Sequence, residues 1–387
     1  MRLLGLAQVD PRVPTTGPGA TSKFLFDALA RRHELVGRHG VDLTRAQFGL
    51  LAAGSFHPSR DKWRQRLYWK GRVALNLRSW NSRRAVGRVE EPFDLVVQVF
   101  GLFRTQGAPY ALYIDNTVEL SRRYWPEWVP VEGRSLERLY DWERRLYRDA
   151  LHIFTLGGPA ARSAVDFYEV PQERVTVVGG GASFDNLPDR PNGSREPTVL
   201  YVGSDWRRKG GDVLIDAFRR VRSEHPEARL QIVGTEEPSA EEGVEVLGFV
   251  RDRSRLADLY ARASVFCLPS RFEPYGLVAV EAMAHELPCV VTPGALAEVV
   301  LDGETGIVVP PEDPVALAGA LARLLEDPPY ARRLGVNGRA RVEGQLTWDA
   351  VVERMTPALE RAAGSGPRSP RSSGRFRRGS AERVASS

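Results

Sequence analysis

The hydrophobic positions of this chain fall into short runs that alternate with longer stretches of helical periodicity, from one end to the other. Short aliphatic and β-branched runs are typical of buried strands, and a period near 3.6 is typical of amphipathic helices. Because strands that alternate with helices form parallel sheets covered by helices, the pattern predicts two doubly wound, Rossmann-like α/β domains. The predicted strands are residues 3–7, 48–52, 95–99, 111–114, 152–156 and 175–178, then 199–203, 230–233, 244–247, 265–268, 289–292 and 307–309.

The two series of strands are separated by residues 185–197, where prolines and turn-forming residues predict a linker. We therefore expect a first domain over residues 1–184 and a second over residues 198–346. A helical pattern at 347–363 is predicted to return to the first domain, and residues 364–387 form a tail. Ligands of open parallel sheets bind beyond the carboxyl ends of the strands, so two such domains predict a cleft between them.

The formal net charge of +5 is located in the tail, whose six arginines stand against one glutamate. A segment of Ser, Gly, Pro and Arg has little to bury, which predicts solvated disorder or weak attraction to acidic lipids or polymers. The rest of the chain is balanced in charge, so we expect no specific nucleic-acid partner.

A basic, aromatic segment lies in the first half of the chain. Residues 60–88 contain ten Lys or Arg against Asp61 alone, interleaved with aromatic residues that include Trp63 and Trp80. The segment suits a surface that touches anionic lipid headgroups or a charged acceptor, or else a solvated helix whose tryptophans pack inward. No apolar run approaches the roughly 20 residues of a membrane-spanning helix, and the first apolar run is short for a signal peptide. We therefore expect a cytoplasmic protein. It is either fully solvated or in peripheral contact with the inner membrane face through residues 60–88 and the tail.

The densest set of candidate functional residues lies directly after a predicted strand of the second domain. Glu273 precedes a Pro-Tyr-Gly turn, and Glu281 lies eight residues later in the helix that follows. The amides of Gly276, Leu277 and Val278 form the start of this helix, and free N–H groups at a helix N-terminus are a site for a diphosphate. Two carboxylates for hydroxyl groups on either side of an anion site suit a nucleoside diphosphate sugar.

A basic loop follows the first strand of the second domain and includes Arg207, Arg208 and Lys209. Cations placed after a strand and at the start of a helix can neutralise a leaving diphosphate. Lys209 is the clearest candidate for this role, with either Arg208 or Arg207 beside it. An ordinary solvated loop position is the alternative for Arg207.

These two elements resemble the family-four retaining glycosyltransferases, the glycosyl transferases group 1, which have the two-domain GT-B fold. The characteristic motif of that family is a pair of glutamates separated by seven residues. This chain has Glu-Pro-Tyr-Gly-Leu-Val-Ala-Val-Glu-Ala-Met-Ala from Glu273 to Ala284. The resemblance implies that Glu273 contacts the transferred sugar and Glu281 the ribose, with the three amides on sugar and phosphates. The family lysine matches Lys209, whereas Ser204 replaces the usual arginine.

The resemblance extends over residues 155–355. The segment Gly248-Phe249-Val250 resembles the one whose backbone meets the nucleotide base, so Phe249 and Val250 are counted as donor-binding residues. One departure is Glu286, where relatives usually end the helix with glycine. A left-handed backbone at Glu286 would be unfavourable for a non-glycine residue.

The first domain matches the family more loosely. Gly17 and Gly19 follow the first strand and resemble the glycine-rich loop that approaches the donor phosphates, although a plain turn is the alternative. Many relatives carry a histidine after a middle strand of this domain, near the reacting centre. Here that position reads Asp115-Asn116-Thr117, so one of these residues would have to stand in as the acceptor-side or catalytic-loop group.

The resemblance implies retaining transfer of a sugar from a nucleoside diphosphate sugar to a hydroxyl of a carbohydrate, lipid-linked or small-molecule acceptor. No two aspartates are two positions apart, so the Asp-x-Asp metal pair of the other major glycosyltransferase fold is missing from the sequence, and no metal or cofactor is expected. Lys209, an arginine and the helix N-terminus would stabilise the leaving diphosphate instead. Two alternatives use the same fold: a sugar-nucleotide epimerase, and a non-catalytic module that binds sugar nucleotides or membranes.

Overall fold

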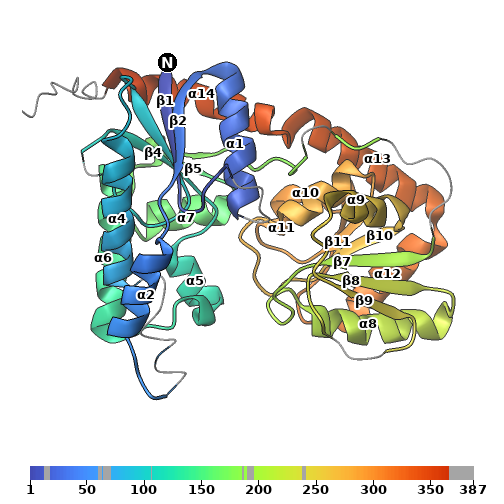
Figure 1. The fold of residues 1–387 in the computed structure, drawn as a ribbon. Helices are drawn as coiled ribbons and strands as arrows, with labels where there is room; N and C mark the ends of the chain where they lie inside the picture. The colour runs from blue at the N-terminus through green and yellow to red at the C-terminus, as the bar shows by residue number, and fades with distance from the viewer. Residues whose placement is uncertain are drawn as a thin grey trace, which may run out of the picture.

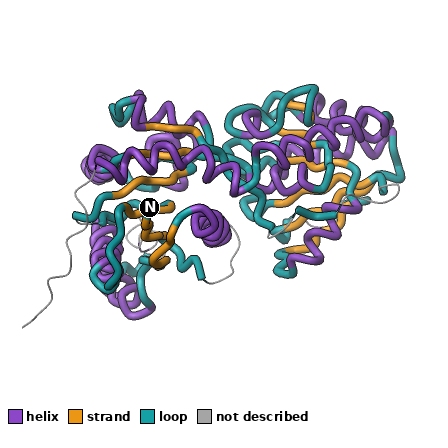
Figure 2. The backbone as a smooth tube through the Cα atoms, turned by 90° about the horizontal axis from the view of Figure 1, so that it is seen from above, coloured by secondary structure: helices purple, strands orange, loops and turns teal. Residues whose placement is uncertain are grey.

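The computed structural model describes residues 1–12, 18–59, 63, 71–105, 107–184, 187–189, 196–237 and 241–365. It contains two six-stranded sheets, each entirely parallel and covered by helices on both faces (Figures 1 and 2). The predicted doubly wound α/β class is therefore confirmed. The tail from residue 366 onwards and much of the predicted linker lie outside the described residues.

The first sheet has the strand order β2-β1-β3-β4-β5-β6. Strands β3 and β4 are buried at every position, as expected for central parallel strands with helices on both faces. The order changes direction between β1 and β3, so the loops after these two strands flank the place where such sheets bind ligands. The strands are β1 (Arg2–Ala7), β2 (Glu34–Gly40), β3 (Leu95–Val99), β4 (Tyr110–Ile114), β5 (His152–Thr155) and β6 (Val175–Val177).

The second sheet has the strand order β12-β11-β10-β7-β8-β9. Its direction of strand order reverses between β7 and β10, and the loops after these strands carry the basic element and the first glutamate of the sequence motif. The strands are β7 (Thr198–Val202), β8 (Arg229–Val233), β9 (Val244–Gly248), β10 (Val265–Leu268), β11 (Cys289–Val291) and β12 (Gly306–Val308).

Helices connect the strands and cover the sheets. In the first half they are α1 (Pro18–Arg32), α2 (Arg45–Gly54), α4 (Arg72–Val86), α5 (Val118–Tyr124), α6 (Gly133–Asp149) and α7 (Gly158–Asp166), with the short 3-10 helices η1 (Pro126–Trp128) and η2 (Gln172–Arg174). In the second half they are α8 (Gly211–Glu224), α9 (Arg253–Arg262), α10 (Leu277–Ala284), α11 (Leu296–Val299), α12 (Pro314–Glu326), α13 (Pro328–Gln345) and α14 (Trp348–Ser365). The last helix, α14, packs against α1, β3 and β5 of the first sheet, and Figure 1 shows it running from α13 over the first half. None of the helices in the described ranges has both the length and the apolar character needed to span a membrane.

One predicted strand is wrong. Residues 48–52 lie in helix α2, which begins after a capping box in which the Thr44 hydroxyl accepts from the Gln47 amide and the Gln47 side chain accepts from the Thr44 amide. The strand that pairs with β1 in that part of the chain is β2, which was not predicted. Its residues Glu34–Gly40 are polar at several positions and none is fully buried, because β2 is an edge strand.

Candidate active site

The basic loop after β7 and the loop after β10 are joined through their backbones. The Arg271 amide donates to the Arg208 carbonyl over 2.8 Å. Gly210 has a φ of 68°, and a Cβ at this position would lie 2.0 Å from the carbonyl oxygen of Pro269. Only glycine allows this approach, and it fixes the register of the two loops at the switch point of the sheet.

This junction places one carboxylate against two cations. Glu273 Oε2 lies 3.3 Å from both Arg208 Nη1 and Lys209 Nζ. The side chains of Glu273, Arg208 and Lys209 are 13%, 7% and 12% exposed, so this group of charges is largely removed from water. Arg208 is also held by Asp205 Oδ2 at 3.0 Å and by the Phe272 carbonyl at 2.6 Å. The structure thus brings together the three residues that the sequence proposed for catalysis.

The local charges set the ionisation of Glu273. Burial alone would raise its pKa, but the positive charges of Lys209 and Arg208 and their hydrogen bonds outweigh burial and hold the pKa below its ordinary value. Glu273 is therefore a carboxylate at neutral pH. As an acceptor-only group it can take hydrogen bonds from the hydroxyls of a sugar.

Helix α10 begins immediately after this group. Gly276, the residue before the helix, has a φ of 95°, and a Cβ there would lie 2.3 Å from Leu296 Cδ2, so glycine is required at this turn. Leu277 and Val278 are the first two helical residues, whose N–H groups have no acceptor within an α-helix. These amides and the helix dipole favour an anion at this end of α10.

The second carboxylate of the motif, Glu281, lies within α10 and is 5% exposed. Its carboxyl group is 3.4 Å from the Tyr260 hydroxyl and 3.5 Å from Arg253 Nη2. Burial raises the pKa of Glu281, and the attraction of Arg253 does not cancel that effect. Arg253, at the start of α9, was not a candidate from the sequence.

We predict that Glu281→Gln maintains or raises the thermal stability of the protein and weakens its binding of a nucleotide. A carboxyl group whose pKa is raised above the unfolded value of 4.5 binds more protons in the folded state, so stability decreases as pH rises from 4.5 through the folded pKa. The glutamine removes this cost, so the thermal midpoint at pH 7 should equal or exceed that of the wild type, and the gain should vanish below about pH 4.5. The family resemblance implies that Glu281 accepts from the ribose of a nucleotide, so we expect nucleotide affinity to fall about tenfold or more, because a hydrogen bond to a charged acceptor is lost.

Thermal unfolding over this pH range and nucleotide titration together test the Glu281→Gln prediction. Glu224→Gln, at the exposed end of α8, is the matched control and should change neither quantity. A lower thermal midpoint with unchanged nucleotide affinity would contradict the prediction.

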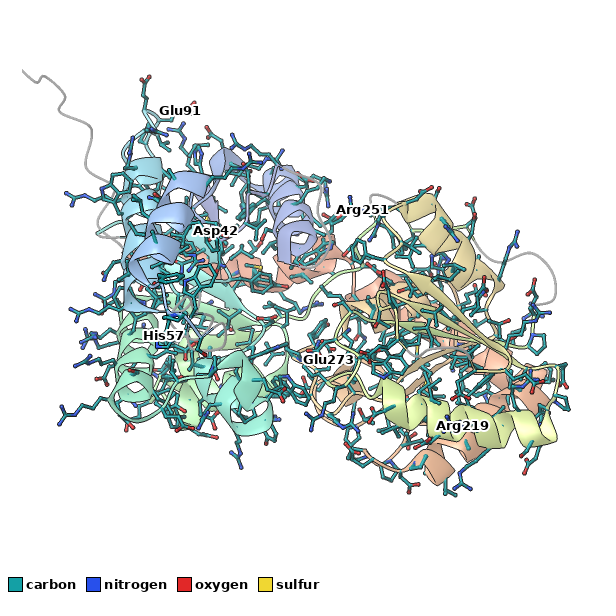
Figure 3. All side chains as sticks on the ribbon, turned by 60° about the horizontal axis from the view of Figure 1, so that its bottom comes forward. Asp42, His57, Glu91, Arg219, Arg251 and Glu273 are labelled. Atoms are coloured by element: carbon teal, nitrogen blue, oxygen red, sulfur yellow. The ribbon has the colours of Figure 1, made fainter. Side chains whose placement is uncertain are left out.

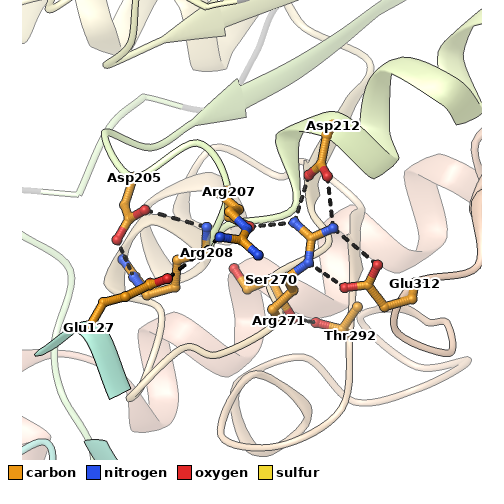
Figure 4. A network of polar contacts seen from close by, with 9 residues as sticks. All are labelled: Glu127, Asp205, Arg207, Arg208, Asp212, Ser270, Arg271, Thr292 and Glu312. Atoms are coloured by element: carbon orange, nitrogen blue, oxygen red, sulfur yellow. Dashed lines mark hydrogen bonds and ion pairs between the residues drawn. The ribbon is translucent and has the colours of Figure 1, made fainter. Parts of the chain in front are cut away.

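An outer layer of ion pairs supports the basic loop (Figure 4). Arg271 forms a bidentate pair with Asp212 at the start of α8, at 2.6 and 2.8 Å, and also pairs with Glu312. Arg207 is exposed and pairs with Glu127 of η1 at 3.5 Å. The geometry thus distinguishes the two candidate arginines, because Arg208 contacts Glu273 and Arg207 points to the first domain.

The first domain contributes a second side to the cleft. A cavity of about 540 Å³ is lined by Asp115 and Asn116, which follow β4, together with Glu273. The Asn116 amide nitrogen donates to Ser121 Oγ at 2.7 Å. Thr117 is buried and caps α5, its hydroxyl accepting from the Leu120 amide. Of the three residues proposed to replace the missing histidine, Asp115 and Asn116 therefore face the cleft.

Contacts between the two domains lie beside the charged group. Tyr124 stacks on Phe272 with ring centroids 5.8 Å apart, and the Arg208 guanidinium lies 4.7 Å from the ring centroid of Trp128. Glu298, which follows β11, accepts a hydrogen bond of 2.7 Å from the Gly158 amide at the start of α7. Sequence reasoning missed these contacts, because each joins residues that are far apart in the chain.

Three other described residues proposed from the sequence do not line this cavity. Gly17 lies outside the described residues, and Gly19 is buried in the first turn of α1. Phe249 and Val250 follow the edge strand β9, do not line the 540 Å³ cavity, and Phe249 is exposed. Glu286, at the position where relatives usually have glycine, has the left-handed backbone, with a φ of 56°.

Comparison with known proteins finds a match to a family model in the second domain. Residues 196–327 match the family model described as glycosyl transferases group 1. The chain is 32% identical over 260 residues to MMP alpha-(1->4)-mannosyltransferase of Mycolicibacterium hassiacum, a match that covers 64% of this chain and 62% of the relative. It is 33% identical over 232 residues to D-inositol 3-phosphate glycosyltransferase of Xylanimonas cellulosilytica, covering 52% of this chain and 55% of that protein. The matches therefore span less than two thirds of either relative.

Solved structures share the fold over nearly the whole chain. Sucrose-phosphate synthase from Thermosynechococcus elongatus superposes with a TM-score of 0.70 at 23% identity, covering 95% of this chain and 100% of that one. Anabaena HepE, solved with UDP and glucose, gives a TM-score of 0.63 at 18% identity, covering 93% and 99%. The chain has the two-domain GT-B fold of these proteins, and its residues 196–327 are a domain of the glycosyl transferases group 1 family.

Proposed function

We propose that this chain is a retaining, metal-independent glycosyltransferase that moves a sugar from a nucleoside diphosphate sugar to an acceptor hydroxyl. The observation that carries the proposal is the position of Glu273 Oε2, 3.3 Å from both Arg208 and Lys209, beside the start of α10. A carboxylate for sugar hydroxyls thus lies next to two cations and two helix amides that suit a diphosphate.

In the proposed reaction, the bond between the anomeric carbon and the phosphate oxygen breaks while the acceptor oxygen forms a bond on the same face. The acceptor hydroxyl passes its proton to the departing phosphate oxygen, so no strong protein base is needed. Arg208, Lys209 and the amides of Leu277 and Val278 stabilise the negative charge that develops on the diphosphate. Glu273 orients the transferred sugar, and Glu281 binds the ribose hydroxyls.

The proposal is tested with a panel of UDP-, GDP- and ADP-sugars in the presence of a chelator. For each sugar, the rate of its hydrolysis and its effect on the thermal midpoint of the protein are measured. We expect one donor to raise the thermal midpoint and to be hydrolysed slowly, with no effect of the chelator. Thermal stabilisation without nucleotide release would indicate a non-catalytic binding module, and interconversion of the donor sugar would indicate an epimerase. A response that disappears with the chelator would contradict metal independence.

We further propose that α2 and α4 contact an anionic lipid surface. Helix α2 has no buried residue, and its Phe48 and Leu50 are 54% and 76% exposed. Trp80 on α4 is 46% exposed, so the expectation that the tryptophans of the basic segment pack inward is wrong for this residue. Arg83 and Arg84 lie on the same helix, and the Arg84 guanidinium lies 4.5 Å from the ring centroid of Trp80. Exposed apolar side chains bordered by arginines are typical of helices that lie in a membrane interface.

Sedimentation with vesicles tests the lipid contact. The protein should bind vesicles of phosphatidylcholine and phosphatidylserine but not phosphatidylcholine alone, because the arginines require anionic headgroups. Leu50→Glu should weaken binding about tenfold or more, since it removes apolar burial and adds a repelled charge. Val315→Glu, at an exposed apolar position of α12, is the control and should bind as the wild type does. Equal binding of both variants would contradict the lipid contact.

A further inference from the structure

The chain leaves the first domain after β6 through residues 179–184, called here the crossing segment, which packs against the motif of the second domain. The Tyr275 hydroxyl, from the turn before α10, donates to the Gly180 carbonyl at 3.4 Å. A Cβ on Gly180 would lie 3.0 Å from Leu277 Cδ2 and 3.1 Å from the Tyr275 ring. The crossing segment therefore lies directly against the start of α10.

The same segment reaches Glu281, one turn further along α10. The Ser183 hydroxyl is hydrogen-bonded to the Glu281 carboxylate, and both residues are buried. On its other side, the carboxyl group lies 3.4 Å from the Tyr260 hydroxyl of α9 and 3.5 Å from Arg253 Nη2. Glu281 is thus held between the crossing segment and α9.

Arg253 joins these two sides. Its Nη2 donates to the Ser183 carbonyl and also lies 3.5 Å from Glu281 Oε1. Its guanidinium lies 5.5 Å from the ring centroid of Phe184, at the end of the crossing segment. The helix that carries Arg253 begins after Asp252, whose side chain accepts from the Ser254 amide and so fixes the first turn. One guanidinium nitrogen is therefore shared between the backbone of the crossing segment and the carboxylate of Glu281.

The charge of Arg253 opposes the effect of burial on Glu281. Burial raises the pKa of Glu281, and the charge of Arg253 and the hydrogen bond from Ser183 lower it without cancelling burial. Removal of Arg253 would raise this pKa further, so that more of the carboxyl group would be protonated near neutral pH. A protonated carboxyl group is a weaker acceptor for hydroxyl groups than a carboxylate.

Other ionisable groups around α10 differ from Arg253 in their partners or their charge. Among the described residues they include Tyr260 of α9, Cys289 of β11, Glu298 of α11 and Arg339 of α13, with His285 on α10 itself. Burial raises the pKa values of Tyr260 and Cys289, which keeps both neutral at pH 7. Glu298 accepts from the Gly158 amide, and Arg339 pairs with Glu343. After burial, the charge of Arg253 has the largest effect on the pKa of Glu281.

We infer that Arg253 is a positioning residue of the nucleotide site, which holds the carboxylate of Glu281 in place for ribose hydroxyls and ties it to the crossing segment. This inference rests on the proposed function, in which Glu281 binds the ribose, and adds a residue outside the sequence motif. Because Arg253 acts through Glu281, its replacement should weaken nucleotide binding through the loss of an ionised acceptor.

Calorimetric titration of the full chain with UDP, GDP and ADP tests the inference, and the nucleotide that binds most tightly is used for the variants. Arg253→Met keeps an apolar stem beside Phe184 and should weaken binding about tenfold at pH 7. The loss relative to the wild type should shrink as the pH rises from 7 to 9, because Glu281 regains its charge. Arg253→Lys retains the positive charge and should retain most of the affinity. Arg255→Met, at an exposed position of the same helix, is the control and should bind as the wild type does at each pH.

A double variant separates positioning from direct contact with the nucleotide. Arg253→Met combined with Glu281→Gln should bind about as tightly as Glu281→Gln alone, because the first change acts through the group that the second removes. Ser183→Ala removes another donor to the same carboxylate without a change of charge, and should weaken binding about threefold or more. It provides the test if Arg253→Met does not fold.

Several results would overturn the positioning role of Arg253. These are a loss of the same size at every pH, additive losses in the double variant, or wild-type affinity in Arg253→Met or, where that variant does not fold, in Ser183→Ala. If the wild type binds a nucleotide and Arg253→Met behaves as Arg255→Met does, the inference fails alone. If the wild type binds none of the three nucleotides, the proposed function fails together with it.

Discussion

Replacement of Lys209 by methionine should lower the rate of sugar transfer about 10²–10³-fold, equivalent to about 2.7–4 kcal/mol of transition-state stabilisation. The ammonium group is held 3.3 Å from Glu273 in a largely buried position, where a charge acts more strongly than in water. Methionine preserves the apolar stem, which packs closely against Gly203. Lys209→Arg retains the charge but not its position, and should fall between the methionine variant and the wild type.

Steady-state kinetics with the donor identified by the panel would measure this effect of Lys209. Arg219→Met is the matched control, because Arg219 lies on the outer helix α8, far from Glu273 in Figure 3, and is paired there with Asp216. A value of kcat for Lys209→Met within about twofold of the wild type would argue against stabilisation of the leaving group by this lysine. If Arg208 acts on the same charge, the double variant should lose less than the product of the single losses.

The largest effect on stability is expected for Glu143→Ala, at about 3 kcal/mol or more. The carboxyl group of Glu143 accepts hydrogen bonds from the Tyr147 and Tyr168 hydroxyls and from the Val118 amide. Alanine would leave three buried donors without their acceptor, and each such loss costs about 1–3 kcal/mol. Because Val118 is the first residue of α5, the change should also loosen the loop that carries Asp115.

Denaturant unfolding would measure the stability effect at Glu143. Glu137→Ala, at an exposed position of the same helix α6, should cost little and is the comparison that isolates burial. Combining Glu143→Leu with Tyr147→Phe and Tyr168→Phe removes the acceptor and two of its three donors, leaving only the Val118 amide unpaired, and should restore part of the lost stability. Equal losses for the Glu143 and Glu137 variants would contradict the role assigned to this buried carboxyl group.

The residues around Glu273 and the start of α10 could be singled out from the sequence because they are close together along the chain. Glu273, the turn at Gly276 and Glu281 lie within nine consecutive residues, so a motif defines their spacing and the helix sets their geometry. Lys209 comes from another loop, and strand order places it beside Glu273. The alternation of strands and helices predicts a parallel sheet whose ligands bind beyond the carboxyl ends of its strands, whereas the strand order itself is known only from the structure.

The cavity of about 390 Å³ in the first domain could not be predicted in the same way. Phe100, Trp128 and Glu143 come from three elements, and each is an ordinary apolar or helical residue in its own sequence surroundings. Their proximity depends on tertiary packing, which no spacing along the chain records. The error at α2 has a related cause. Its apolar run Phe-Gly-Leu-Leu-Ala-Ala resembles a strand. The segment forms a helix instead, because a capping box at Thr44 starts a helix and because Ala and Leu favour helices.

The path of the last helix changes what counts as a separable unit in this protein. The chain crosses between the two halves once between β6 and β7 and again between α13 and α14, where it returns to cover α1. A cut between β6 and β7 would therefore not release the halves, because α14 would still hold its place on the first sheet. The first folding unit is thus discontinuous in sequence, and a fragment that ends before α14 would expose the apolar surface that this helix covers.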